Sequence, residues 1–131
     1  MSPNVPRTEQ RQWLRLSLAA EEEVKALLKA LPAPVREKVA PIPIVFEAEP
    51  SPEMVEDGTD PDLMGLFLGN AYEEGGLHPE PTQILLFLRN IWEEVEHDTA
   101  EYRLEVRKTL LHEIGHFLGL GEDDLGIRDL E

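Results

Sequence analysis

Four prolines from residue 32 to residue 43 divide this chain into a helical N-terminal part and a later part that contains strands. Proline lacks the amide hydrogen that a helix interior needs, so Pro32 and Pro34 must end the helix that precedes them. Apolar residues recur at helical spacing before these prolines, and Ser17 is predicted to be the N-cap. After them, the alternating run of residues 41–49 predicts a strand whose prolines favour the edge of a sheet.

Two further segments have the composition of strands. The first is expected over residues 63–69 and follows residues 50–62, an acidic, turn-rich stretch that is interpreted as a loop. The second is expected over residues 82–92, and its apolar residues occupy both faces, so both faces should be covered. With helices before and after them, these strands predict an α+β fold with a small mixed sheet.

A long helix is expected to follow the last strand. Asp98 and Glu101 form a capping box, with a carboxylate at the helix start and a glutamate three residues on. Gly119 and Gly121 supply the positive-φ conformations that stop a helix, so its end should lie near residue 118. Four residues are expected to share its buried face: Leu104, Leu111, Ile114 and Leu118.

The length of 131 residues fits one domain. We expect a single domain over residues 17–131, preceded by an N-terminal extension, residues 1–16, that is partly flexible or helical. The chain has 12 Lys and Arg against 27 Asp and Glu, a formal net charge of −15. Such a charge repels phosphate backbones and argues against a nucleic-acid partner.

Several absences limit where the protein works and what it can bind. No apolar run is long enough to span a membrane, and residues 1–13 lack the apolar segment of a secretory leader, so we expect a cytoplasmic protein without a membrane partner. There is no cysteine, so any metal must be held by His, Asp or Glu. The lack of Cys, the eleven prolines and the many charged residues are also typical of thermophiles.

The predicted C-terminal helix contains the sequence His112-Glu113-Ile114-Gly115-His116. Histidines four residues apart project from neighbouring turns of one helix face, so His112 and His116 can converge on one Zn²⁺. Glu113 projects differently and can take a proton from a water in the open position of the metal. The pattern therefore predicts a zinc site with a carboxylate general base.

A third ligand is expected just beyond the helix. Gly119 follows His116 at the spacing H-E-x-x-H-x-x-G and lets the chain reverse, so a later residue can approach the metal from the other side. Glu122 stands ten residues after His112, and Asp123 adjoins it. We favour Glu122 as the third ligand, with Asp123 as the alternative.

The segment VRKTLLHEIGHFLGLGEDDL resembles the active-site helix of the small bacterial zincin-like metallopeptidases. Upstream segments are similar to successive segments of the same family, so the resemblance covers roughly residues 17–127. These upstream segments are ALLKALPAPVREKV, PIPIVFEAEPSP, LMGLFLG and TQILLFLRNIW.

The resemblance implies a minimal zincin fold, with a metal-binding helix under a short sheet. Carried over residue by residue, it makes His112 and His116 the ligands of one zinc ion and Glu113 the catalytic base, with Glu122 as third ligand. It also implies a peptide or protein substrate, added as another strand along residues 83–90.

Two features depart from the larger zincins. No third histidine or methionine follows the motif, and no C-terminal subdomain is expected to form a second wall of the cleft. An alternative function is therefore a non-catalytic interaction module whose metal is structural or vestigial. A metal endoribonuclease is disfavoured, because such enzymes use a third histidine and a positive surface.

Overall fold

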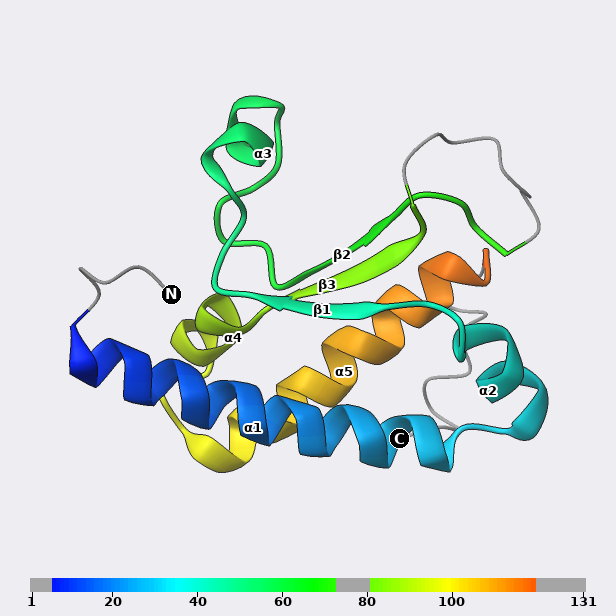
Figure 1. The fold of residues 1–131 in the computed structure, drawn as a ribbon, viewed down its shortest axis with the longest axis horizontal. Helices are drawn as coiled ribbons and strands as arrows, with labels where there is room; N and C mark the ends of the chain where they lie inside the picture. The colour runs from blue at the N-terminus through cyan, green and yellow to red at the C-terminus, as the bar shows by residue number, and fades with distance from the viewer. Residues whose placement is uncertain (1–5, 73–80, 120–131) are drawn as a thin grey trace.

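The computed structural model describes residues 6–72 and 81–119, and it has the α+β class that the sequence predicts. The long helices pack beneath one small sheet (Figure 1). The elements in chain order are α1 (Arg7–Ala30), α2 (Ala33–Val39), β1 (Ile44–Glu47), α3 (Pro52–Glu56), β2 (Gly65–Leu68), β3 (Gln83–Phe87), α4 (Leu88–Glu94) and α5 (Thr99–Phe117). Among these helices, none combines the length and apolar character that a membrane span requires.

The three strands form a mixed sheet in the order β1-β3-β2. Strand β1 runs parallel to β3, with Phe46 opposite Leu86, and β2 runs antiparallel to β3, with Leu66 opposite Leu85. The prolines before β1 predict an edge strand, and β1 is one.

The same order corrects one prediction about a partner. Strand β3 pairs with a strand on each side, so residues 83–90 are not the free edge to which a peptide could add. Its central place also explains why Ile84, Leu85, Leu86 and Phe87 are all buried.

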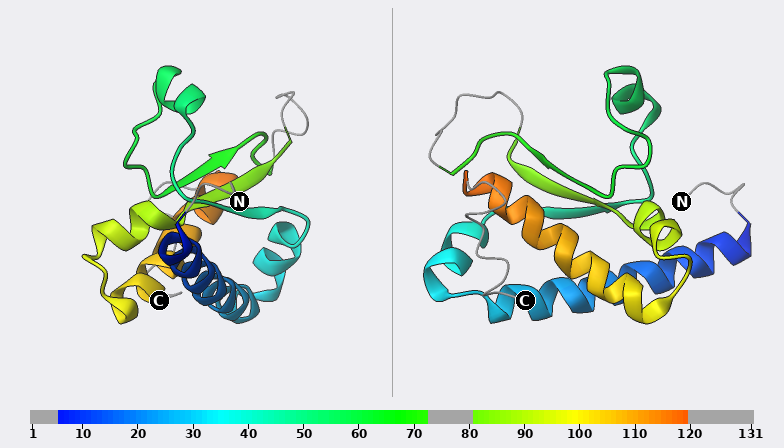
Figure 2. Two further views of the ribbon diagram at one scale, coloured as in Figure 1. Left: turned by 60° about the vertical axis from the view of Figure 1, so that its left-hand side comes forward. Right: turned by 180° about the vertical axis from the view of Figure 1, so that it is seen from behind.

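Helices α1 and α5 lie side by side across one face of the sheet (Figure 2). The core lies between these two helices and the strands, because each contributes one apolar face. Its largest fully buried members are Tyr102, Ile84, Leu86, Leu88, Ile91, Leu110 and Ile114.

Helix α1 begins at Arg7 and runs without a break to Ala30. Ser17 lies inside this helix, so the prediction of an N-cap at Ser17 is wrong. The reason is that apolar residues before Ser17 also pack inward: Leu16 is buried, and Trp13 lies against the core. Of the two states expected for the N-terminal extension, residues 7–16 therefore adopt the helical one.

Helix α5 has the predicted start and end. The Asp98 side chain caps it by accepting a hydrogen bond from the backbone N–H of Glu101 at 2.9 Å. The helix ends at Phe117, and Gly119 follows with φ +75°. Gly121 lies outside the described residues.

The predicted buried face of α5 is partly wrong. Leu111 and Ile114 are buried, but Leu104 is 38% exposed. Helix α5 contacts α1 on one side and the sheet on the other, so its buried arc is wider than one stripe and passes through Val106 and Leu110 instead.

Two short helices lie where other elements were predicted: α3 lies within the predicted loop, and α4 takes the place of the end of the predicted third strand. Within the predicted loop, Ser51 caps helix α3 by accepting from the N–H of Met54 at 3.2 Å. The third strand stops at Phe87, where the last residue of β1, Glu47, is opposite it. Beyond that point β1 offers no further strand partner, and the chain continues as α4.

The connection between β2 and β3 is closed at its base. Gly69 has φ +92°, and a Cβ there would lie 2.6 Å from the Cα of Thr82, so only glycine fits. The N–H of Asn70 donates to the Thr82 hydroxyl oxygen at 2.9 Å, and that hydroxyl donates to the Asn70 carbonyl at 3.3 Å. These contacts, which we name the β2–β3 clasp, hold the two ends of the connection together.

Candidate metal centre

Helix α5 brings the two histidines of the motif together. His112 and His116 stand on successive turns, and their Nε2 atoms lie 3.0 Å apart. The ring centroids are separated by 4.5 Å and the rings are tilted by 56°. Each imidazole ring therefore directs its Nε2 atom toward one point beside helix α5.

This separation fits a pair of metal ligands. Two imidazole nitrogens about 2.1 Å from one tetrahedral Zn²⁺ are separated by about 3.4 Å. The observed 3.0 Å is close to that value, so the pair can accept an ion with only a small rotation of the rings. Neutral imidazole is also a suitable donor for this borderline-soft cation.

The described residues supply two of the ligands expected for the metal, His112 and His116. In residues 6–72 and 81–119, no group of three or more His, Cys, Asp or Glu side chains could hold a metal ion. Glu122 and Asp123, the two residues expected to complete the site, lie outside the described residues.

Glu113 is one of the few buried polar side chains in the described part of the chain, with 7% of its surface exposed. Burial raises the pKa of its carboxyl group, because desolvation penalises the charged form. The charges of His116 and His112, and a hydrogen bond from the backbone N–H of Phe67, lower that pKa in part. The carboxyl group is thus held between the histidine pair and strand β2.

Strand β2 approaches α5 very closely at this point. A Cβ placed on Gly65 would lie 2.5 Å from Cγ2 of Thr109 and 3.2 Å from Cγ of Glu113, so no larger residue fits without moving the strand. Gly65 was not among the predicted site residues. An isolated glycine inside a strand pattern is nevertheless a recognisable signal of such an approach.

A groove of about 570 Å³ opens between β2 and α5, beside the two histidines. Residues 63–67 form one wall, and that wall is mostly apolar. Six side chains of α5 form the rest: Glu105, Lys108, Thr109, His112, Glu113 and His116. Three of these, Glu105, Lys108 and Thr109, were not predicted, although they stand seven, four and three residues before His112 on the same helix.

The chain matches the zincin-like metallopeptidase family over residues 39–130, which is more than half of its length. It belongs to the zincin-like metallopeptidase family. The resemblance expected from the sequence is therefore confirmed over residues 39–130. No curated protein matches the chain.

The family match places the groove in its context. The match spans the three strands and α5, and also the acidic positions 122 and 123. Helix α1 precedes the matched region, although Leu16, Ala20 and Leu27 of that helix are part of the same core as α5.

Other titratable side chains make contacts away from the histidine pair. His97 pairs with Glu93 at 3.1 Å and stacks on Trp92, so it does not contribute to the metal centre. The Tyr102 hydroxyl donates to the Leu16 carbonyl at 2.8 Å and its side chain is buried, so Tyr102 serves packing between α5 and α1. His78 lies outside the described residues.

Proposed function

We propose that this metallopeptidase hydrolyses peptide bonds with one Zn²⁺ held by His112 and His116. The observation that carries the proposal is the pair of Nε2 atoms 3.0 Å apart at the side of a groove, with a buried carboxyl group next to them. Glu122 is the proposed third ligand, with Asp123 as its alternative. When bound, Zn²⁺ supplies Lewis acidity and lowers the pKa of water to about 7.

Glu113 is the proposed general base. Its carboxylate takes a proton from the attacking water and passes the proton to the leaving amine nitrogen. Burial supports this role, because a carboxyl group with a raised pKa holds a proton more readily near neutral pH. The hydrogen bond from the Phe67 N–H fixes the carboxylate toward the groove.

The substrate is proposed to lie along the outer edge of β2, in place of the buried strand β3. The N–H of Phe87 donates to the Met64 carbonyl at 2.8 Å, so the backbone of Met64 faces β3. By the alternation of an antiparallel ladder, the backbones of Gly65 and Phe67 face away from β3, toward the groove. An extended peptide added at this edge passes over Glu113 and the two histidines, and it pairs with the backbone of Gly65, because the Phe67 N–H already donates to Glu113.

Substitution of the base tests the proposal. Glu113→Gln should keep stoichiometric zinc but lower the rate of cleavage of a mixed peptide library by at least about a hundredfold. His112→Ala should lose zinc as well as activity. His97→Ala is the matched control, because His97 lies away from the groove, and it should retain both.

Stability measurements keep this test interpretable. The metal-free Glu113→Gln variant should be no less stable than wild type, because burial disfavours the charged carboxylate and the amide keeps an acceptor for the Phe67 N–H. Equal activity of Glu113→Gln and wild type contradicts the proposed base. Tight zinc binding with no cleavage of any peptide, in wild type as in the variant, supports the interaction-module alternative instead.

A further inference from the structure

Two leucines on the outer side of α1 are more exposed than any other large apolar side chain in residues 6–72 and 81–119. Leu14 is 58% exposed and Leu18 is 53% exposed, and they stand one helical turn apart. The other exposed large apolar residues, Val55, Tyr72 and Leu104, lie on three different segments. Leu14 and Leu18 therefore form the one pair of adjacent exposed apolar side chains among them.

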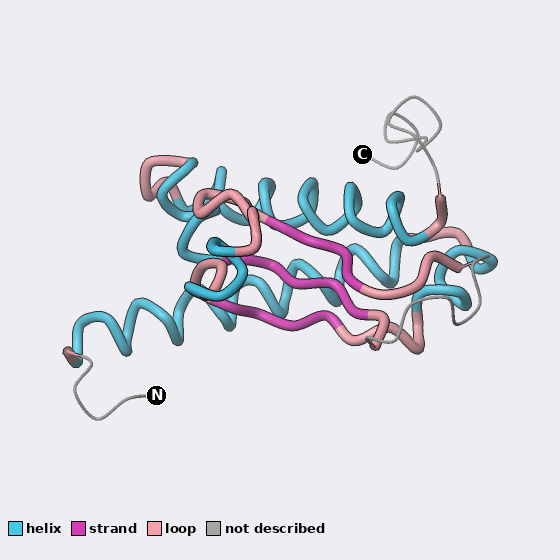
Figure 3. Tube along the Cα trace, turned by 90° about the horizontal axis from the view of Figure 1, so that it is seen from above, coloured by secondary structure: helices cyan, strands magenta, loops and turns pink. Residues whose placement is uncertain are grey.

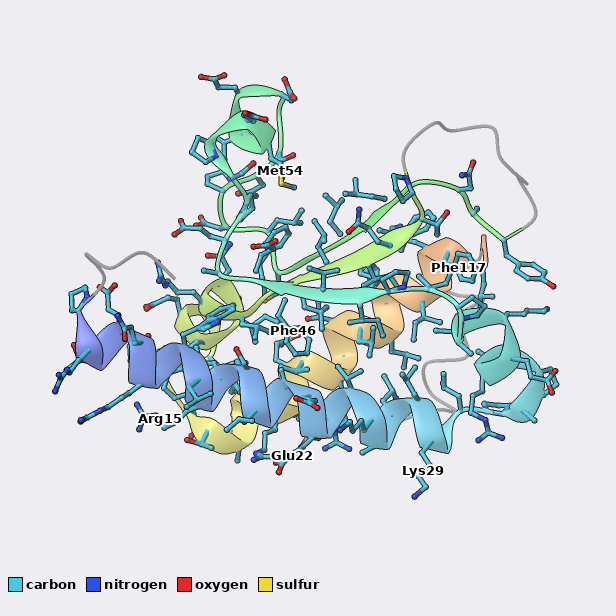
Figure 4. The ribbon with its side chains drawn as sticks, in the orientation of Figure 1. Arg15, Glu22, Lys29, Phe46, Met54 and Phe117 are labelled. Carbon is cyan, nitrogen blue, oxygen red and sulfur yellow. The ribbon has the colours of Figure 1, made fainter. Side chains whose placement is uncertain are left out.

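This part of α1 extends away from the rest of the fold. The buried residues of α1 begin at Leu16, and the first turns of the helix lie beyond the end of the sheet (Figure 3). The labelled side chains of Arg15, Glu22 and Lys29 point away from the sheet (Figure 4). Packing of an apolar face usually stabilises a helix, so an extended helix with exposed leucines is suited to a partner.

The exposed leucines belong to a regular stripe. Successive positions are separated by four, three, four, three and four residues, which is the spacing of a helix seam that pairs with another helix. The six positions are Arg7, Arg11, Leu14, Leu18, Glu21 and Lys25.

We propose that α1 pairs in antiparallel orientation with α1 of a second copy of this chain. Reversing the stripe about its centre places Leu14 against Leu18 of the second copy, and Leu18 against Leu14 of that copy. The same operation places Arg11 opposite Glu21 of the second copy, and Glu21 opposite Arg11. The interface is thus isologous, with two apolar contacts between two ion pairs.

The ends of the stripe are compatible with this arrangement. Arg7 falls opposite Lys25 of the second copy, but the Nζ atom of Lys25 is already 2.9 Å from Oε1 of Glu21 in its own helix. The Lys25 side chain is 74% exposed, so solvent screens this like-charged pair. Because four leucines form the centre, the interface is small and the association is weak and reversible.

Charge also favours a second copy over an anionic lipid surface. The basic residues Arg7 and Arg11 share the stripe with Glu21, and Glu22 and Glu23 follow directly. The net charge of −15 opposes approach to an anionic membrane and to a second copy alike, but only the second copy offers on its α1 both charges in complementary order.

The first experiment is sedimentation equilibrium of the full chain with exchanged charges. Wild type should dimerise reversibly, and Arg11→Glu or Glu21→Arg alone should raise the dimer dissociation constant by at least about tenfold. The two single variants mixed together should form a heterodimer, because each then presents the charge that the other lacks. The double variant Arg11→Glu/Glu21→Arg should recover self-association.

The second experiment tests the apolar centre and the orientation. Leu14→Glu should abolish the dimer, and Val55→Glu, at another exposed apolar residue, should leave it unchanged. Since the chain has no cysteine, Leu14→Cys and Leu18→Cys can be combined without background. The mixture should form disulfide-linked heterodimers faster than either variant forms homodimers.

Three results of these two experiments would overturn the proposal. They are a wild-type chain that stays monomeric at the highest soluble concentration, a dimer that persists in Leu14→Glu, and single charge variants that fail to associate when mixed. Binding of the monomer to vesicles of anionic phospholipid through Leu14 and Leu18 would assign the stripe to a membrane instead, and would also overturn it.

Discussion

The two halves of α5 are held to the rest of the protein by different contacts. In residues 99–107, charged side chains bridge to α1: Arg103 lies 2.9 Å from Glu22 and 2.8 Å from Glu23, and Arg107 lies 3.0 Å from Glu23. In residues 108–117, the helix lies so close to β2 that only glycine fits at position 65. The candidate metal centre is in the second half.

We therefore expect the contacts of residues 99–107 to tolerate substitution, and the contact of residues 108–117 with β2 to tolerate little. Long charged side chains near solvent can shift or be replaced with little loss, because water substitutes for their partners. A strand and a helix in direct contact leave no room for adjustment, so they fix the side chains between them. The histidine pair and Glu113 are therefore expected to depend on Gly65 far more than on the ion pairs to α1.

The largest effect is expected for Gly65→Ala. The added methyl group would lie 2.5 Å from Cγ2 of Thr109, so the Thr109 side chain, β2 or α5 must move. We expect a loss of about 2 kcal/mol in the free energy of unfolding, measured by urea titration, and weaker zinc binding. Thr109→Ser removes Cγ2, so the double variant Gly65→Ala/Thr109→Ser should recover part of the loss. An unaltered stability of Gly65→Ala would contradict the close approach.

An intermediate effect is expected for Tyr102→Phe, at the joint between α5 and α1. Loss of the hydrogen bond to the Leu16 carbonyl should lower the free energy of unfolding by about 1 kcal/mol near neutral pH. The effect of Tyr102→Phe on the free energy of unfolding should change in alkali. The reason is that burial raises the pKa of the Tyr102 hydroxyl above its ordinary value, while the Arg103 charge lowers it in part.

The sign of the alkaline effect follows from that raised pKa. Above about pH 10 the unfolded chain loses the Tyr102 proton first, so wild type should lose stability as the pH rises. Tyr102→Phe should lack this contribution, and Tyr72→Phe, at a tyrosine that is 48% exposed, should keep it. Urea unfolding at about pH 8 and about pH 11 measures the difference. A parallel loss in wild type and Tyr102→Phe would show that Tyr102 is not the responsible group.

The smallest effect is expected for Glu23→Gln. The arginines that it joins are exposed, with 37% and 47% of their side-chain surface in solvent, so we expect a loss of about 0.5 kcal/mol that disappears at high salt. A loss as large as that of Gly65→Ala would remove the contrast between the two halves of α5.

Local sequence signals predicted most of α5. The Asp98 cap, the glycine at position 119 and the two histidines four residues apart act within one or two helical turns, so no knowledge of the fold was needed to place them. The pairing of His112 with His116 follows from helix geometry alone.

Contacts between distant segments were not predictable in the same way. The apolar residues of β3 predicted burial on both faces, but not that β1 and β2 flank it, because strand order depends on the whole chain. Leu104 has a suitable spacing for a buried face and is exposed because α1 covers a different arc of α5. The need for glycine at position 65 depends on the contact between β2 and Thr109 of α5, which are far apart in the sequence.

The β2–β3 clasp makes the connection between β2 and β3 a suitable place to insert new sequence. Because Gly69, Asn70 and Thr82 join the ends of the connection, its length is decoupled from the register of the two strands. Each doubling of a closed loop costs only about 0.6 kcal/mol in chain entropy. A tag, reporter or binding peptide inserted between the two ends should therefore leave the Gly65 contact and the groove intact. The clasp thus allows foreign sequence to be attached at this end of the sheet.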